Sequence, residues 1–170
     1  KFRDYIMDFF LKAIKVDITS NAYFGDIDRP NDSTGVWNWN TFDGIFKHIA
    51  GYINNGVIKA NQTAAITEDI LDAQASVNYL EWAYGNQDIF LRALPQNMKA
   101  FYVTQSIFDG YAKFLKLTGG GNNIQYYTNG FAKLQYEGID VLVEPTWSPV
   151  MYLLNGTKNA HACILPIKGH

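Results

Sequence analysis

The side chains that could form a metal site or a nucleophilic centre are few and scattered. His161 and Cys163 alternate in sequence, so both would lie on one face of an extended strand. A zinc site needs three or four ligands, and neither His48 nor His170 stands at a spacing that would complete one. A Cys–His hydrolase would need His48 or His161 as its base, but no known nucleophile motif surrounds Cys163. We therefore interpret Cys163 as a buried apolar residue and expect no bound metal and no cofactor.

A cluster of aspartates between two predicted helices resembles a calcium loop only superficially. Asp26, Asp28 and Asp32 lie in one polar segment. The EF-hand pattern needs oxygen ligands at alternate positions and a glutamate at the twelfth. Pro30 occupies the third alternate position and Trp37 the twelfth. Solvated turn residues explain this segment better than a bound cation does.

Two further patterns could belong to an enzyme, and both fail on spacing or context. Asp140 and Glu144 would share a strand face about 13 Å apart, whereas the paired carboxylates of glycosidases lie roughly 5–9.5 Å apart. The glycine run at 119–121 follows a predicted helix and lacks the Gly-Lys-Ser/Thr sequence that enters a helix in a phosphate-binding loop. Because no catalytic constellation emerges, we expect that the chain is not an enzyme.

Aromatic side chains are the most unusual part of the composition. Phe, Trp and Tyr make up 15% of the chain, while charged residues make up only 18%, below the roughly 25% of ordinary domains. Trp37 and Trp39 alternate, as sugar-stacking aromatic residues sometimes do, and Trp147 lies further along. A carbohydrate-binding module therefore stays open as a hypothesis. Packing beneath a neighbouring element or subunit is the competing interpretation.

Length and charge limit the remaining classes. The chain has 170 residues, is 48% hydrophobic and has a net charge of −2, which is incompatible with disorder and with a basic nucleic-acid-binding face. No apolar stretch approaches the roughly 18 residues of a membrane-spanning helix. The first 22 residues contain too many charges for a signal peptide: Arg3, Asp4, Asp8, Lys12, Lys15 and Asp17. We expect no membrane partner.

Hydrophobic periodicity predicts a mixed α+β fold with helices early and strands late. The helical patterns cover residues 3–21, 42–53, 67–84 and 86–94 and a segment that begins at 106. Thr41, Thr67 and Ser106 are predicted as N-caps. The strand patterns cover residues 57–58, 100–103, 134–136, 139–143, 150–154 and 160–167.

The order of these segments resembles a known family. A long helix runs into Ala22-Tyr23-Phe24-Gly25-Asp26, and after a polar loop Phe42-Asp43-Gly44-Ile45 begins another helix. Residues 99–117 (KAFYVTQSIFDGYAKFLKL) are similar to a strand, turn and helix of that family, and residues 134–143 (LQYEGIDVLV) are similar to one of its strands. The family is that of the major capsid proteins of tailed bacteriophages and prophages, which share the Hong Kong 97-type capsid fold. The resemblance covers most of residues 5–165.

The resemblance implies a fold and a set of segment roles. Residues 1–24 would be the C-terminal part of the spine helix of the peripheral domain. Residues 25–160 would be the axial domain, a central sheet flanked by helices, and residues 161–170 would begin a strand leading back to the peripheral domain. The sequence would then be a core fragment of a longer subunit, and we expect a monomer or a weak oligomer in isolation. A stable closed particle would contradict that expectation.

The resemblance also implies a structural function. The subunit would self-assemble into pentamers and hexamers of an icosahedral shell, with weak non-specific contact to packaged DNA. It would be located in the virion, after assembly in the cytoplasm of the host bacterium. An encapsulin-like shell protein of the same fold is an alternative that the sequence does not separate from a phage capsid. The candidate subunit-interface residues are Trp37, Trp39, Tyr126, Tyr127 and Trp147.

Overall fold

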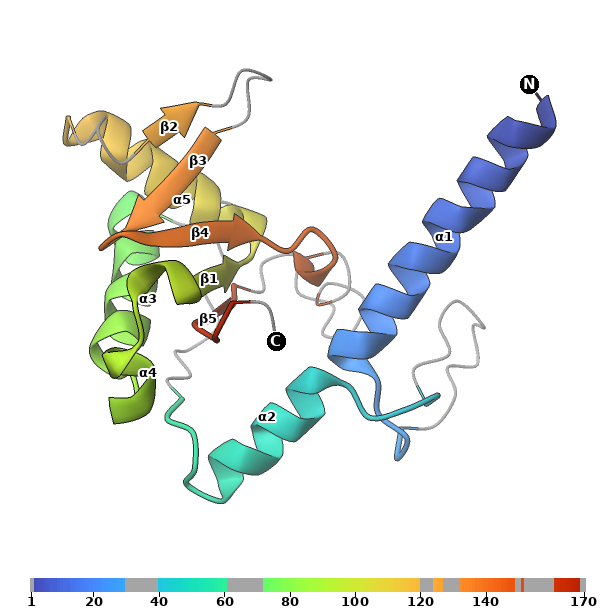
Figure 1. The fold of residues 1–170 in the computed structure, drawn as a ribbon, viewed down its shortest axis with the longest axis horizontal. Helices are drawn as coiled ribbons and strands as arrows, with labels where there is room; N and C mark the ends of the chain where they lie inside the picture. The colour runs from blue at the N-terminus through green and yellow to red at the C-terminus, as the bar shows by residue number, and fades with distance from the viewer. Residues whose placement is uncertain are drawn as a thin grey trace. The chain divides into compact units, whose positions relative to one another are not determined.

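The computed structural model forms two compact units, Lys1–Gln62 and Thr63–His170, and each is described by itself. It describes residues 2–29, 40–60, 72–119, 124–126, 132–148, 151 and 161–168. Figure 1 shows the helices of the first unit in blue and cyan and the elements of the second in green to red. The predicted boundaries after residues 24 and 160 concern the roles of segments in an assembled subunit, and they stay a prediction.

The first unit consists of two helices. α1 spans Phe2–Phe24, longer at both ends than the predicted 3–21, and α2 spans Ile45–Asn54. The N-cap of α2 is Gly44 rather than the predicted Thr41, because the Asp43 carboxylate accepts the Ile27 backbone N–H at 3.0 Å and lies outside the helix.

The strand predicted at residues 57–58 is wrong. The backbone N–H groups of Val57 and Ile58 both donate to the Tyr52 carbonyl, at 2.9 and 3.3 Å. The two residues therefore satisfy a carbonyl in the last turn of α2 and do not pair with a strand. An isolated pair of apolar residues in the sequence does not show this.

The second unit is built on one mixed sheet with the strand order β2-β3-β4-β1-β5. Its strands are β1 (Ala100–Val103), β2 (Ile124–Tyr126), β3 (Ala132–Tyr136), β4 (Ile139–Val143) and β5 (Cys163–Ile164). β1 and β4 are parallel, and the other neighbouring pairs are antiparallel. The helices are α3 (Ala73–Gly85), α4 (Ile89–Ala93), the 3₁₀ helix η1 (Gln96–Met98) and α5 (Gln105–Leu117). The prediction of a mixed α+β fold is confirmed at this level.

Local sequence chemistry explains several of these boundaries. The tight turn predicted between the strands at 134–136 and 139–143 is present, with Glu137 at φ 49° and Gly138 at φ 76°; two left-handed residues are what a two-residue hairpin turn requires. α5 begins two residues earlier than predicted, because Thr104, with an extended backbone, is its N-cap in place of Ser106. The predicted N-cap Thr67 lies outside the described residues. The prediction of one helix over 67–84 is wrong at Asp72, because that residue has a non-helical backbone and is the N-cap of α3.

The core of this unit lies between one face of the sheet and the pair α3 and α5. Figure 1 shows α5 running behind β3 and β4. Alternate residues of β1, β3 and β4 point to this layer, as period-2 alternation requires. The buried cluster comprises Val77, Leu80, Phe101, Val103, Ile107, Tyr111, Leu115, Leu134, Ile139 and Val141.

The opposite face of the sheet carries an ion cluster centred on Asp140. Its carboxylate lies 2.9 Å from Lys133 Nζ and 3.0 Å from Lys168 Nζ, and it accepts the Gln135 side-chain amide at 2.8 Å. Burial opposes ionisation and is the largest single influence, but these three donors together outweigh it and lower the pKa of Asp140 to about 2. The carboxylate is therefore ionised at all ordinary pH values and holds β3, β4 and the C-terminal segment together.

Candidate assembly surface

The surface of α1 exposes far more apolar area than a solvated helix requires. Nine large apolar side chains of α1 are between 47% and 79% exposed. They are Phe2, Tyr5, Met7, Phe9, Phe10, Leu11, Ile14, Val16 and Ile18, and together they are called here the apolar surface of α1. Single exposed apolar residues are normal on proteins, but a contiguous set of this size marks a contact surface.

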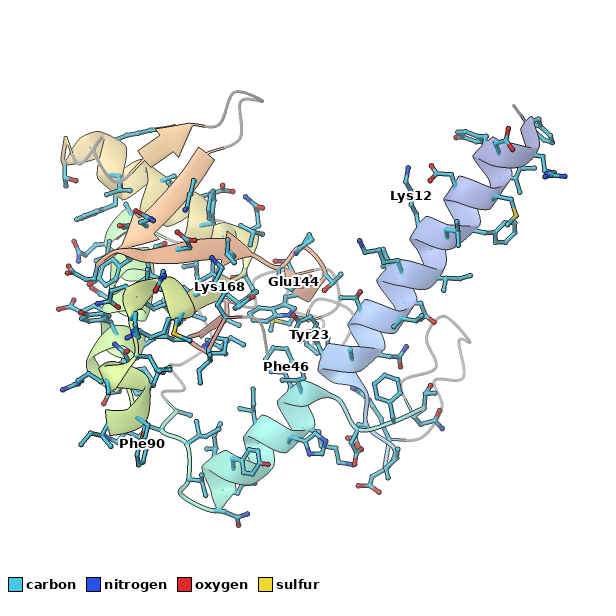
Figure 2. The ribbon with its side chains drawn as sticks, in the orientation of Figure 1. Lys12, Tyr23, Phe46, Phe90, Glu144 and Lys168 are labelled. Carbon is cyan, nitrogen blue, oxygen red and sulfur yellow. The ribbon has the colours of Figure 1, made fainter. Side chains whose placement is uncertain are left out.

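The apolar surface of α1 extends around about two thirds of the helix, at about 100° per residue. The polar strip is narrow: Asp4, Asp8, Lys12 and Lys15 follow one another at three- and four-residue steps. Within it, Lys12 Nζ lies 2.7 Å from Asp8 Oδ2, and Figure 2 labels Lys12 on the helix. Arg3 and Asp17 interrupt the apolar arc. A helix that is apolar over most of its circumference is typical of one buried among several neighbours.

Two glycines connect α1 to α2 by direct backbone contact, and this connection is called here the α1–α2 joint. Gly44 N–H donates to the Gly25 carbonyl at 2.7 Å. A Cβ atom on Gly25 would lie 2.2 Å from the Phe42 carbonyl oxygen, and one on Gly44 would lie 2.7 Å from the Tyr23 carbonyl oxygen. Only residues without a side chain fit at this crossing.

Charge and aromatic contacts reinforce the α1–α2 joint. Lys47 Nζ lies within 2.6–2.7 Å of the carboxylates of Asp26, Asp28 and Asp43. Hydrogen bonding to these carboxylates raises the pKa of Lys47, and hydrogen bonding to Lys47 lowers the pKa values of Asp26 and Asp43. Asp26 and Asp28, two members of the superficially calcium-like segment, therefore bind an ammonium group.

Three aromatic rings pack at the same joint. The Phe46 ring lies 5.9 Å from Tyr23 and 4.9 Å from Phe24, between ring centroids, and Figure 2 shows Tyr23 and Phe46 close together. Residues 22–26 and 42–45 thus form a joint that fixes the direction in which α1 leaves α2.

The aromatic residues predicted to form an interface are not brought together in the described part of the chain. Trp37, Trp39 and Tyr127 lie outside the described residues. Tyr126 ends β2, an edge strand of the sheet, and only its backbone is described. Trp147 is fully buried, so its ring offers no area to a neighbouring chain in this conformation, and we leave it out of the proposed surface.

The apolar surface of α1 was missed by sequence reasoning because helical periodicity was used to find one stripe. The helical pattern at residues 3–21 rests on apolar side chains at three- and four-residue steps, and Phe9, Phe10 and Ile14 among them are all exposed. The missed signal was the density of apolar residues outside that stripe, such as Leu11 and Ile18, which makes α1 apolar on several sides.

The two residues considered for nucleophilic chemistry, His161 and Cys163, have different surroundings. His161 Nδ1 shares a hydrogen bond with Ser106 Oγ at the start of α5. Burial raises the pKa of the Cys163 thiol to about 12, so the thiolate is scarce at neutral pH. Within the described ranges, no three His, Cys, Asp or Glu side chains come close enough to hold a metal ion. In the same ranges, no helix combines the length and apolar character needed to cross a membrane.

Comparison of the chain with protein-family models, with curated proteins and with solved structures finds no match.

Proposed function

We propose that the chain is a structural subunit that self-assembles through the apolar surface of α1, as a shell protein with the Hong Kong 97-type capsid fold would. The observation that carries this proposal is the exposure of nine large apolar side chains on one helix. Its neighbours would be other copies of the chain, arranged as pentamers and hexamers of an icosahedral shell.

The exposed area is large enough for such a function. Nine side chains, each roughly 60% exposed, offer on the order of 1,000 Å² when a large apolar side chain has about 150–250 Å². A stable interface buries about 800 Å² per partner. The apolar surface of α1 alone therefore provides as much area as one partner of a standard interface.

The α1–α2 joint supports the same proposal. An exposed apolar helix on a loose tether would collapse onto any apolar surface, whereas this helix is connected through a backbone crossing and a lysine bound to three carboxylates. A fixed direction lets identical copies meet by the same contact, which closed symmetric assemblies require. Weak non-specific contact with packaged DNA and location in the virion belong to the same proposal.

Sedimentation velocity over a series of protein concentrations, followed by native mass spectrometry, tests this function. We expect weak, concentration-dependent association that reaches rings of five or six copies. The apolar surface of α1 narrows the sequence-based expectation of a monomer or a weak oligomer to a weak oligomer. A chain that stays monomeric up to about 1 mM, where even an association free energy of about −4 kcal/mol is detected, would therefore contradict the proposal. An association that stops at dimers would contradict the proposed shell and support only the proposal that α1 forms a contact surface.

A further inference from the structure

A cavity of about 370 Å³ lies in the second unit where α3 ends. α4, η1 and the start of β1 contribute its other walls; Figure 2 labels Phe90 on α4 as a landmark. The residues that line the cavity are Tyr84, Gly85, Gln87, Arg92, Gln96 and Lys99. It is called here the Lys99 cavity.

Lys99 is a buried cation with a neutral partner. The residue is 2% exposed, and its Nζ donates to Gln87 Oε1 at 3.1 Å. Its backbone is fixed by a hydrogen bond to the Gln96 carbonyl and by a β-bridge to Ile167. Among the described residues, no carboxylate pairs with its ammonium group. Burying an ammonium group without a counter-ion is unfavourable.

A second cation faces the same cavity. The Arg92 guanidinium donates from one nitrogen to the Gly85 carbonyl at 2.9 Å, at the C-terminus of α3. That bond uses one of the five N–H donors of the group. No carboxylate in the described part of the chain pairs with Arg92. Burial first, and then the charge of Arg92, lower the pKa of Lys99. The positive charge of the exposed Arg92 therefore adds to the cost of charging the buried Lys99.

We propose that the Lys99 cavity binds a small organic anion, whose carboxylate or phosphate group lies between Lys99 Nζ and the Arg92 guanidinium. An oxyanion would neutralise two like charges at once, and the guanidinium fork suits both oxyanion types. The side-chain amide of Gln96 supplies a further polar group, and Tyr84 supplies an aromatic wall. The Gln87 amide donates to the Tyr84 carbonyl at 2.7 Å and accepts from Lys99, so it positions the lysine. The volume is at the lower end of small-molecule sites, which fits a short organic part attached to the anionic group.

A purely structural role for Lys99 predicts a different effect of substituting this residue, and the experiment below distinguishes the two roles. If Lys99 only fills space with its aliphatic stem, methionine would replace it without changing any anion affinity, because methionine keeps that stem and lacks the charge. If Lys99 binds the anion, Lys99→Met loses binding while the fold is retained or stabilised. Lys113→Met is the matched control, because Lys113 is exposed on α5 and its loss changes the net charge equally.

The experiment is a titration of the full chain with inorganic phosphate and with succinate at constant ionic strength. Amide chemical shifts of Gly85 and Gln87 report binding, and sodium chloride is the non-specific control. We expect saturable shifts with at least one of the two probes in the wild type and in Lys113→Met, and binding at least about tenfold weaker in Lys99→Met. The probe that binds identifies a phosphate or a carboxylate as the recognised group.

Three results would overturn the proposal: shifts with neither probe, equal shifts with chloride, or unchanged affinity in Lys99→Met. Arg92→Gln keeps a donor for the Gly85 carbonyl and removes the second charge, so it tests the same cavity if Lys99→Met fails to fold. Retained affinity in Arg92→Gln would then count against the site.

Discussion

Replacing Phe10 by glutamine removes an aromatic ring from the middle of the apolar arc of α1, between Ile6 and Ile14. Phe10 is 56% exposed, which corresponds to roughly 110 Å² of a side chain of about 200 Å². If a neighbouring copy covers that area, its loss costs about 3 kcal/mol at roughly 25 cal/mol/Å². Association would then be weakened about 100-fold for each ring that the contact buries.

The fold should be unaffected by this substitution, because glutamine forms helices at least as well as phenylalanine does. Sedimentation equilibrium measures the association constant, and circular dichroism measures helix content and the free energy of unfolding. Lys15→Gln, on the polar strip, is the matched control and should associate as the wild type does. Equal association of Phe10→Gln and wild type, or equal weakening in the control, would refute the reasoning.

Three further predictions concern the stability of the two units, two for the second unit and one for the α1–α2 joint of the first. Asp140→Asn should lose about 2 kcal/mol of stability at neutral pH, because the native pKa of about 2 lies below the roughly 3.9 of an unfolded aspartate. That stabilisation is complete above about pH 4 and is lost as the pH falls towards 2. Over this range the free energy of unfolding should therefore change less with pH in the variant than in the wild type. Equal pH dependence would contradict the stabilising role assigned to the Asp140 carboxylate. Leu80→Ala, at a fully buried site, should cost about 2–5 kcal/mol in denaturant unfolding, whereas the exposed Leu117→Ala should cost little, and equal costs would argue against the described core. Gly25→Ala should disrupt the α1–α2 joint and speed proteolysis between the helices. Gly51→Ala, with open space around it, should instead stabilise α2 by about 0.5–1 kcal/mol. A tolerated Gly25→Ala together with a destabilising Gly51→Ala would contradict the backbone crossing at the joint.

The parts of the fold that local chemistry determines were predictable. The strand at 100–103 has a short apolar run with polar neighbours, and the turn at Glu137-Gly138 lies between two alternating segments. Such signals depend on neighbours in sequence. The parallel pairing of β1 with β4 joins residues 40 positions apart, for example Ala100 and Asp140. No local pattern encodes that register.

Helix starts were predicted less well where a tertiary contact competes for the cap. Asp43 looked like a first-turn residue of α2, but its carboxylate binds Lys47 and the Ile27 backbone instead. Ser106 looked like a cap of α5, but it bonds His161 from a distant part of the chain. Polar side chains have several possible partners, and the sequence does not show which one lies nearby.

The sequence led us to expect an apolar contact surface, but not at the residues of α1. Low charge and many aromatic residues led us to expect an apolar contact surface, and we assigned it to three tryptophans and to Tyr126 and Tyr127. Trp147 is buried, because a large ring close to a sheet is easily covered by the fold. Whether a residue is exposed depends on what packs over it; for α1 the available signal was the density of apolar residues on several sides of the helix, which a search for one stripe does not detect.

Photo-crosslinking from position 10 tests the central claim most directly. A benzophenone amino acid in place of Phe10, in an equal mixture of ¹⁵N-labelled and unlabelled chains, reports whether the captured peptide comes from the same or another copy. We predict mixed-isotope crosslinks whose yield rises with protein concentration, with peptides of a second copy attached at α1. Crosslinks that join only peptides of one isotope, at a yield independent of concentration, would show that α1 packs within its own chain and would contradict self-assembly through this helix.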